Sequence, residues 1–319
     1  MSDEFSVRFG PAIEDWVART APGTLRDKVA GLRAAYEQGS SSAGVDLAAY
    51  LTVRAPATFA AISAALREVV RLMPDFAPET LSDLGAGPGT ASFVAAAQFP
   101  SLKLATMVEA DPRFAKLAEE LAQALPFPAS LLRHSILGAI EPANLVIAAY
   151  VLAEMPLQQT AQIALHLWRA THGVLLLVEP GTPQGFARIK AARDALVKVG
   201  AHIVGPCTHE AACPMAKDDW CHFKARLQRS RAHMHAKGGT VPFEDEAYSW
   251  LAVSRFAAVR DEARVLAPPT VTKIGVNLRL CGKAGLHDEM IASRNKPAYK
   301  RAKKLSWGDG FSRTKTREA

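Results

Sequence analysis

The spacing of hydrophobic and polar residues predicts a chain that begins with helices and continues as alternating strands and helices. Residues 12–37 and 46–73 are rich in alanine and leucine with charges on one face, a pattern typical of amphipathic helices. From residue 80, short apolar runs alternate with amphipathic stretches. The predicted strands cover 80–84, 104–108, 130–133, 145–150 and 174–178, and the predicted helices cover 89–98, 112–124, 157–171 and 183–199. This alternation indicates five βα units around a mostly parallel sheet.

The last third of the chain loses this rhythm. It contains a cysteine-bearing loop, a basic segment at 224–237, strand-like runs near 248–254 and 273–281, and a basic tail from Arg294. We therefore predict four parts. They are an N-terminal helical lead-in at 1–75, a Rossmann-like core at 76–206, the cysteine loop with final strands that complete the sheet at 207–290, and a basic tail at 291–319.

Composition supports a globular protein. Of the 319 residues, 49% are hydrophobic and 22% are charged, which argues against a disordered, collagen-like or coiled-coil chain. We predict no membrane association, because uncharged apolar runs stay shorter than the roughly 18 residues that a span needs. The first residues, MSDEFSVRFG, carry acids where a targeting peptide has bases. These features predict a cytoplasmic protein.

The net charge of +7 is concentrated at the C-terminal end. Residues 1–206 hold 17 Lys and Arg against 19 Asp and Glu, whereas residues 207–319 hold 21 against 12. All four cysteines also lie in the later segment, at Cys207, Cys213, Cys221 and Cys281. In a reducing compartment, clustered thiols favour a metal site over disulfides.

A glycine-rich loop follows the first predicted strand. Gly85, Gly87 and Gly89 stand two residues apart, directly after Asp83. At the carboxyl edge of a parallel sheet, such a turn lets the backbone and a helix N-terminus approach a polar ligand. Glu109 lies 20 residues beyond Gly89, at the end of the next strand, where a carboxylate can accept hydrogen bonds from ribose hydroxyls. The arrangement predicts adenosine recognition, and the alternative is a glycine turn without a ligand.

The same loop favours one adenosine cofactor. A dinucleotide fingerprint has its third glycine at the position of Thr90, so a nucleoside without phosphates fits better. The Asp-x-Gly-x-Gly-x-Gly order from Asp83 resembles motif I of class I S-adenosylmethionine-dependent methyltransferases, and Glu109 matches their ribose-binding acid. Tyr150 and Glu154 lie near this edge. Each is a packing residue, a cofactor contact or an acid/base group, and the sequence leaves these roles open. Glu179 either faces the ligand or caps the next helix, and we assign no catalytic residue.

The four thiols predict a metal centre. Three of them fall within 15 residues, and Cys281 follows much later. Zinc sites usually use tight Cys-x2-Cys pairs, so these wider gaps favour an iron–sulfur cluster, and Cys213-Pro214 is also typical of cluster loops. Zinc remains an alternative, with His209 and His222 as further ligands. The other alternative is four unrelated buried thiols.

With these motifs located, most of the chain resembles the methyltransferase-like small-subunit ribosome assembly proteins of mitochondria and many bacteria. The segments that carry the resemblance are LSDLGAGPGT (81–90), LVIAAYVLAEMP (145–156), VEPGTPQGF (178–186), CTHEAACPM (207–215), DWCHF (219–223), Cys281 and YKRAKKLSWGD (299–309).

That resemblance implies a class I methyltransferase fold with a metal-binding insertion and a basic tail. It also implies an S-adenosyl-L-methionine pocket, a [4Fe–4S] cluster on all four cysteines, and association with the small ribosomal subunit and its rRNA. Because no presequence is evident, we expect the bacterial, cytoplasmic branch. We also expect a monomer.

Two basic stretches are candidates for RNA contact. One runs from Lys224 to Lys237, and the other is the tail, with nine bases against two acids. The tail bases are Arg294, Lys296, Lys300, Arg301, Lys303, Lys304, Arg313, Lys315 and Arg317. Tyr299 and Trp307 add rings that can stack on unpaired bases. The alternative is a solvated tail. Two functions remain open: an assembly factor in which catalysis is optional, and an active rRNA methyltransferase.

Overall fold

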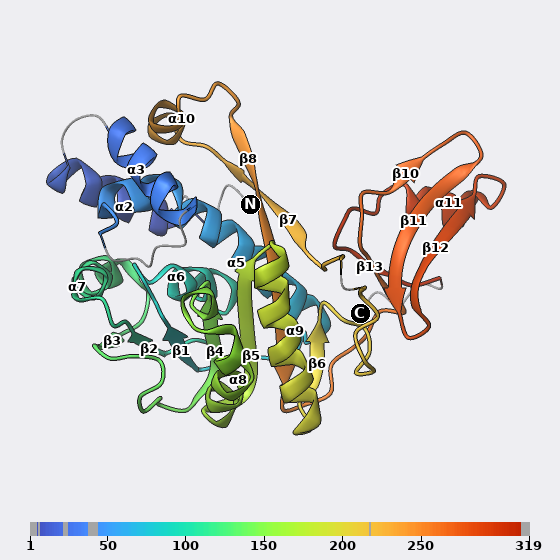
Figure 1. Cartoon of the computed structure of the whole chain (residues 1–319), viewed down its shortest axis with the longest axis horizontal. Helices are drawn as coiled ribbons and strands as arrows, with labels where there is room; N and C mark the ends of the chain where they lie inside the picture. Colours follow the sequence, from blue (N-terminus) through green and yellow to red (C-terminus); the bar gives the residue numbers. More distant parts are fainter. Residues whose placement is uncertain (1–4, 6, 22–24, 38–43, 217, 314–319) are drawn as a thin grey trace.

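The computed structural model describes residues 5, 7–21, 25–37, 44–216 and 218–313. They form an eight-stranded main sheet covered by helices on both faces and a separate five-stranded sheet (Figure 1). The strands of the main sheet are β1 (Thr80–Leu84), β2 (Leu104–Val108), β3 (Ala129–Leu132), β4 (Ala143–Ala149), β5 (Thr171–Pro180), β6 (His202–Gly205), β7 (Phe223–Gln228) and β8 (Phe243–Ser254).

The main sheet has the order β3-β2-β1-β4-β5-β8-β6. Its first five strands are parallel, β8 is inserted antiparallel between β5 and β6, and β7 pairs with the first half of β8. The predicted α/β fold, a Rossmann-like class I methyltransferase sheet with N-terminal helices, is therefore confirmed. Since parallel strands all end at one edge, the loops after β1, β2, β4 and β5 meet there.

Helices cover both faces of this sheet. The N-terminal helices are α2 (Phe9–Thr20), α3 (Arg26–Glu37), α4 (Leu47–Val53) and α5 (Ala55–Leu72), and the crossover helices are α6 (Thr90–Gln98), α7 (Pro112–Leu121), α8 (Thr160–Arg169) and α9 (Pro183–Lys198). Short 3-10 turns occupy Ala122–Ala124, Leu152–Glu154 and Leu157–Gln159, and α10 (Arg231–Lys237) follows β7. The apolar alternation of β4 explains the two layers: Ile147 packs toward α5 and α6, whereas Val146 and Ala148 pack toward α8 and α9.

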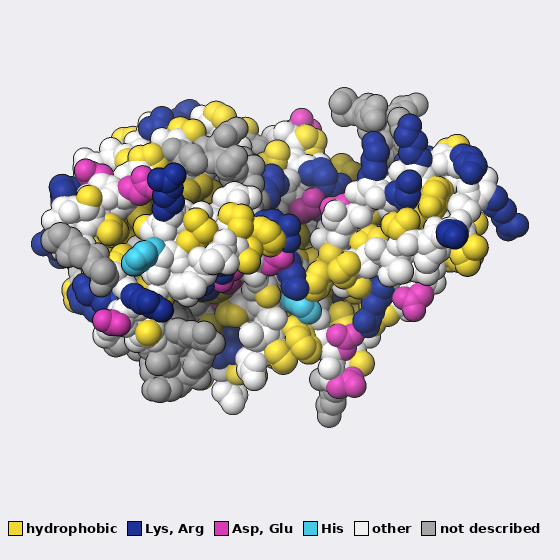
Figure 2. Space-filling view, turned by 90° about the horizontal axis from the view of Figure 1, so that it is seen from above, with side chains coloured by type: hydrophobic (Ala, Val, Ile, Leu, Met, Phe, Trp, Pro, Cys, Tyr) yellow, Lys and Arg dark blue, Asp and Glu magenta, His cyan; other side chains and the backbone are white. Residues whose placement is uncertain are grey.

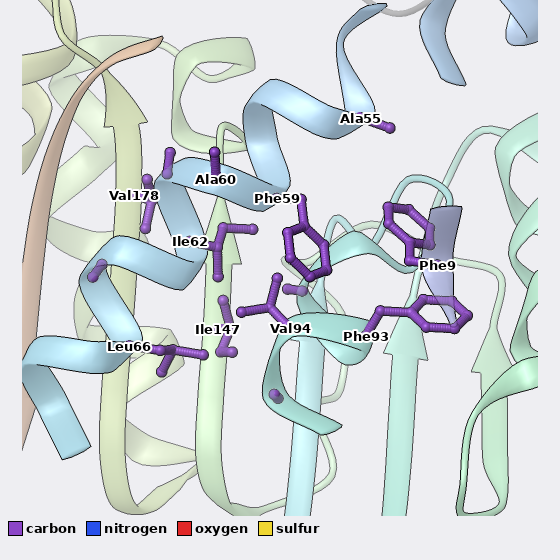
Figure 3. Close-up of a cluster of buried hydrophobic side chains, with 14 of the residues drawn as sticks. Phe9, Ala55, Phe59, Ala60, Ile62, Leu66, Phe93, Val94, Ile147 and Val178 are labelled. Carbon is purple, nitrogen blue, oxygen red and sulfur yellow. The ribbon is translucent and has the colours of Figure 1, made fainter. Parts of the chain in front are cut away.

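Aromatic packing attaches the N-terminal helices to the core. The Phe9 ring stacks on Phe93 of α6, with centroids 4.6 Å apart, and on Phe59 of α5 at 5.8 Å. Figure 3 shows these rings beside Ile62, which points from α5 toward Ile147. The lead-in is thus a structural layer of the main domain, because its aromatic face is buried against the sheet.

The predicted helix at 46–73 is broken. Asp46 caps α4 by accepting a hydrogen bond from the Ala49 N–H at 2.9 Å, and Arg54 separates α4 from α5. Within the described ranges, no single helix is long and apolar enough to cross a membrane, and α4 and α5 reach that length only as a pair bent by 44°. The predicted helix at 12–37 divides into α2 and α3. Residues 38–43, between the two predicted helices, lie outside the described residues.

The second sheet corrects the expectation that all late strands complete the main sheet. It consists of β9 (Ala263–Val265), β10 (Thr270–Val271), β11 (Gly275–Gly282), β12 (Gly285–Ala292) and β13 (Gly310–Phe311), with α11 (Lys296–Ala302). Gly282 pairs with Gly285 across a two-residue turn, and Gly285 has φ +91°. This local hairpin explains why β11 pairs with β12 instead of returning to the main sheet. The start of the predicted basic tail is also folded, as α11 and β13.

Candidate functional site

The three positions of the loop need glycine for different structural reasons. All have positive φ, at 68°, 55° and 82° for Gly85, Gly87 and Gly89. A Cβ on Gly85 would lie 2.5 Å from Val151, and one on Gly89 would lie 3.2 Å from the Met107 sulfur. A Cβ on Gly87 meets nothing closer than 3.9 Å. Gly87 therefore has open space beside it, whereas the other two glycines permit close packing inside the protein.

The nearest atom to that open space is the Tyr50 hydroxyl, which comes from α4. Glu109, just after β2, contacts the same loop, because its Oε2 accepts a hydrogen bond from the Gly87 N–H at 2.8 Å. Its Oε1 accepts from the Asp111 N–H, also at 2.8 Å. The fold thus brings the predicted ribose acid onto the glycine loop and leaves further lone pairs on its carboxylate for hydroxyl donors.

Asp83 faces the protein interior. It is 2% exposed, and its Oδ2 accepts hydrogen bonds from the Ser92 N–H at 2.9 Å and the Ser92 hydroxyl at 2.8 Å. Burial raises the pKa of Asp83 to about 7. The Asp83 side chain fixes the first turn of α6, so it supports the glycine loop from the protein interior.

Tyr150 ends β4 at the same edge of the sheet, with φ +62°. Its hydroxyl donates to Glu246 Oε1 at 3.1 Å, and Glu246 also forms an ion pair with Arg54 at 3.2 Å. The Arg54 guanidinium carbon lies 5.6 Å from the centroid of the Tyr150 ring. Burial and the Glu246 carboxylate raise the pKa of Tyr150 well above its ordinary value, so the phenol stays neutral.

Glu179, at the end of β5, holds the turn that follows Tyr150. It is fully buried, and its Oε1 accepts from the Leu152 N–H at 2.9 Å. Arg188 of α9 completes this clasp by donating to the Leu152 carbonyl at 2.7 Å and the Met155 carbonyl at 3.0 Å. Burial raises the pKa of Glu179 to about 8. The residue is a buried acid that fixes the 3-10 turn Leu152–Glu154.

The interpretation of Glu179 as the cap of α9 is wrong. The cap is Thr182, whose hydroxyl accepts from the Gly185 N–H at 3.1 Å. Glu154 remains near the ligand edge, where burial and the carboxylates of Glu109 and Asp111 raise its pKa.

The four cysteines lie around one cavity. Cys207, Cys213, Cys221 and Cys281 all line it, and its volume is about 30 Å³. Burial raises the pKa of the Cys207 and Cys221 thiols and brings the pKa of Cys281 to about 12. Over the described ranges, no group of three or more His, Cys, Asp and Glu side chains is arranged to hold a metal ion. The metal site therefore remains a prediction.

The cysteine loop is attached to the main sheet near the ligand edge. The Trp220 indole N–H donates to the carbonyl of Gly181, just beyond β5, at 2.9 Å. The Ser249 hydroxyl of β8 donates to the Cys221 carbonyl at 2.8 Å. The cavity is thus fixed to strands β5 and β8, and Cys281 reaches it from β11 of the second sheet.

The two basic stretches differ in how far their charges are paired. In the 224–237 segment, Arg226 pairs with Asp245, and Arg229 and Lys237 both pair with Glu244. These acids neutralise much of that segment.

Four bases at the start of the predicted tail have no hydrogen-bond, ion-pair or ring partner among the residues that the structure describes: Arg294, Lys296, Lys300 and Lys304. Figure 2 shows Lys and Arg side chains gathered over the second sheet, at the right of the view. Arg313 pairs with Glu289, and Lys315 and Arg317 lie outside the described residues. The rings of Tyr299 and Trp307 are half-buried, under Lys303 and Lys224 respectively.

Sequence reasoning missed Tyr50, Arg54 and Glu246 at the ligand edge. A signal for Arg54 exists, because it is the single charge between Asp46 and Arg67 in an otherwise apolar helical stretch. Glu246 lies in a run of three consecutive acids at 244–246, which is typical of an exposed segment and gives no signal of a buried role.

Residues 44–312 match the family described as mitochondrial small ribosomal subunit Rsm22. The human mitochondrial ribosome assembly protein METTL17 is 27% identical over 299 residues, which is 86% of this chain and 64% of that protein. The mitochondrial Rsm22-cox11 tandem protein 2 of Schizosaccharomyces pombe is 26% identical, over 82% of this chain and 42% of its own length. The chain therefore spans less than two thirds of these relatives.

Solved structures with a similar fold include magnesium protoporphyrin IX methyltransferase from Synechocystis with bound S-adenosylhomocysteine. It has 13% identity and a TM-score of 0.44, over 73% of this chain and 98% of that one. A putative RNA methyltransferase from Pyrococcus horikoshii has 13% identity and a TM-score of 0.40, over 61% and 83%.

The prediction of a bacterial, cytoplasmic location is wrong, because the matching family and the named relatives are mitochondrial. That prediction relied on the acids near Met1, and the composition of one end of a chain does not decide its compartment.

Proposed function

The chain belongs to the Rsm22 family of mitochondrial small ribosomal subunit proteins, and we propose that it acts in the assembly of that subunit. In this proposal it works as a single chain, binds rRNA, and carries S-adenosylmethionine and a [4Fe–4S] cluster. One observation carries the proposal. Four cysteines from distant parts of the sequence of this chain line one cavity, next to the edge of the sheet that carries the glycine loop.

The glycine loop supports the cofactor part of the proposal. Gly87 has open space next to its backbone, and Glu109 is already fixed against it with free lone pairs. S-adenosylmethionine presents ribose hydroxyls and carries no phosphate. A site made of a carboxylate and a glycine turn without Lys or Arg side chains therefore suits it. When bound, this cofactor supplies an electrophilic methyl group. The residues of this chain that would hold it are Gly87 and Glu109.

The surroundings of Tyr150 favour an assembly factor over an enzyme. Its hydroxyl is a donor to Glu246, and the Arg54 ion pair fixes that carboxylate. A neutral phenol that is already hydrogen-bonded is poorly prepared to remove a proton from a methyl acceptor. Glu179 is also committed, since it holds the Leu152 N–H.

The thiols support the cluster part through their chemistry. Four sulfur donors around one cavity suit an iron–sulfur cluster or zinc, both of which take thiolates. The rest of the cavity lining is mostly apolar, with Phe186, Ile189 and Leu251 among its residues, which suits a metal group that is shielded from water.

The unpaired bases at Arg294, Lys296, Lys300 and Lys304 support RNA binding by the second-sheet end. Phosphate contacts give binding that weakens steeply with salt, with a slope of about 0.7 per contact for single strands. Replacing all four bases by glutamine should therefore lower the slope for small-subunit rRNA by up to about 3. The matched control replaces Arg226, Arg229 and Lys237, which already pair with acids, and should change the slope much less. Equal losses in both variants would contradict the assignment.

Oxygen-free purification tests the proposal as a whole. We expect iron and sulfide in equal amounts, near four of each per chain, a brown colour, and co-sedimentation with immature small subunits. A colourless protein that carries zinc would overturn the cluster, and failure to sediment with ribosomal particles would overturn the assembly role.

A second experiment separates the assembly factor from an enzyme. The purified chain is incubated with immature small subunits and S-adenosylmethionine that is labelled in the methyl group. We expect cofactor binding without label in the RNA, and loss of binding in Gly87→Arg. The control Gly31→Arg, at a glycine on α3 that also has open space, should bind normally. Label in the RNA that disappears in Gly87→Arg would instead establish a methyltransferase.

A further inference from the structure

Two buried basic side chains share the cysteine cavity. His209 is 7% exposed and Arg193 of α9 is 3% exposed, and both line the cavity together with the four thiols. Neither ring nitrogen of His209 forms a well-oriented hydrogen bond with the described residues, although the ring lies beside the Ala211 backbone. The same holds for Nε of Arg193, whose side chain lies within hydrogen-bonding reach of the Cys207 thiol. Three buried nitrogens without well-oriented partners therefore belong to side chains that border one small space.

Such groups are costly. A buried donor or acceptor without a partner costs about 1–3 kcal/mol, and a buried charge without compensation costs more. Folded proteins therefore rarely leave these groups unpaired unless a bound group completes them. The concentration of unpaired nitrogens at one cavity points to a partner that occupies the same cavity.

The rest of the Arg193 side chain is held firmly. One terminal nitrogen donates to the carbonyls of His209 at 3.1 Å and Ala211 at 2.6 Å, and the other donates to Asp194 at 3.2 Å. Arg193 therefore fixes the backbone of the loop that carries His209. Its charge also lies close enough to the Cys207 thiol to oppose the rise in the pKa of that thiol caused by burial.

His222, the other histidine next to a cysteine, is placed differently. Its Nδ1 is hydrogen-bonded to the Trp220 carbonyl at 3.2 Å, and its ring stacks on the Trp220 ring with centroids 5.3 Å apart. It is absent from the residues that line the cavity. The two histidines therefore form a natural pair for comparison.

We infer that His209 and Arg193 donate N–H groups to the sulfur atoms of the metal group held by Cys207, Cys213, Cys221 and Cys281. This inference rests on the proposed function. Four thiolates give a bound cluster a net negative charge, and donors in a buried wall offset that charge. Hydrogen bonds to cluster sulfurs raise the reduction potential, and residues around the ligands strengthen metal retention by about 10- to 100-fold. His209 and Arg193 are thus positioning residues around the cluster, and the cysteines remain its ligands.

The test compares His209→Leu, His209→Gln and the control His222→Leu in protein purified without oxygen. Three quantities are measured: iron and sulfide per chain, the reduction potential, and the rate of iron transfer to a chelator. We expect His209→Leu to keep the cluster, with a lower potential and iron loss at least about tenfold faster. His209→Gln, which retains an N–H donor, should recover part of both losses. His222→Leu should behave as the unchanged protein.

Several results would overturn the inference. One is an unchanged potential and release rate in His209→Leu, and another is the same change in His222→Leu. Complete loss of iron in both His209 variants, with far-ultraviolet circular dichroism intact, would make His209 a ligand. If the unchanged protein carries zinc, the cluster proposal fails, and the zinc release rates of the same variants decide the role of His209.

Arg193 is tested with Arg193→Lys and Arg193→Gln. Lysine keeps the charge but lacks Nε and the planar fork. We expect the potential to fall in the order of the unchanged protein, Arg193→Lys, Arg193→Gln. Equal potentials in all three proteins would remove Arg193 from the donor set.

Discussion

The buried carboxyl of Glu179 makes the stability of the protein depend on pH in a direction opposite to that of most acids. Its pKa is about 8 in the folded chain, against an ordinary value of 4.5, because burial disfavours the charged form. Below pH 4.5 both states are protonated. Between pH 4.5 and 8 the unfolded chain loses the proton while the folded chain keeps it, so stability falls as the pH rises. Above pH 8 both states are ionised and the effect stops growing.

The magnitude follows from the difference between the two pKa values. At about 1.4 kcal/mol per pH unit, the loss between pH 4.5 and 8 reaches about 5 kcal/mol. Glu179 is fully buried, so solvent screening does not reduce this value. Glu179→Gln keeps an oxygen that can accept from the Leu152 N–H and cannot ionise. Relative to the unchanged protein, the variant should gain about 1.4 kcal/mol of unfolding free energy for each pH unit between 5 and 8.

The assay is urea unfolding at pH 5, 6, 7, 8 and 9, followed by tryptophan fluorescence and circular dichroism. The difference in unfolding free energy between Glu179→Gln and the unchanged protein is plotted against pH. We expect a rising line that levels above pH 8. Glu141→Gln, at an exposed acid, is the control and should give a difference that does not change with pH. A constant difference for Glu179→Gln from pH 5 to 9 would refute the reasoning.

Three further substitutions test the packing around the two sites. Gly85→Ala should destabilise the fold by about 2 kcal/mol or more, since its Cβ would lie 2.5 Å from Val151, and adding Val151→Ala should recover part of this loss in thermal melts. If the double variant melts no higher than Gly85→Ala alone, the clash is not the cause. Arg264→Met should cost about 3–5 kcal/mol in urea unfolding, because this 2% exposed arginine forms an ion pair with Glu68. A cost below about 1 kcal/mol would show that the ion pair contributes little. Tyr150→Phe should cost about 1–2 kcal/mol in the same assay through loss of its hydrogen-bond to a carboxylate, and an unchanged midpoint would contradict that account.

Local patterns were sufficient to predict the parallel part of the fold. The predicted bounds of the strands at 80–84 and 104–108 agree with β1 and β2. These strands are short, apolar and separated by amphipathic helices, so the period of the sequence alone identifies them. The strands β6, β7, β9, β10, β12 and β13 were missed, because they are polar, very short, or paired with residues far along the chain. Such strands are stabilised by their neighbours more than by their own composition.

Residues at the ligand edge could be predicted only where they directly follow strands that the sequence pattern identifies. The glycines and Glu109 follow successive strands, and a parallel sheet brings such loops together. Arg54 and Glu246 are 192 residues apart, and their ion pair exists because β8 inserts beside β5 and α5 crosses both strands. No local pattern encodes that insertion. Asp83 shows the reverse error, since its position in a motif suggested a ligand contact and the fold turns its side chain inward onto Ser92.

The end of β5 shows why the two predicted sites have to be considered together. Glu179 accepts from the Leu152 N–H in the turn after Tyr150, 27 residues away in sequence. Two residues after Glu179, the Gly181 carbonyl accepts from Trp220 in the cysteine loop, 39 residues away. A displacement of the cysteine loop is therefore resisted by the same strand end that fixes the turn beside the cofactor edge. Because one contact is made to the last buried residue of β5 and the other to the residue directly after the strand, a shift of either loop acts on the strand end that holds the other loop.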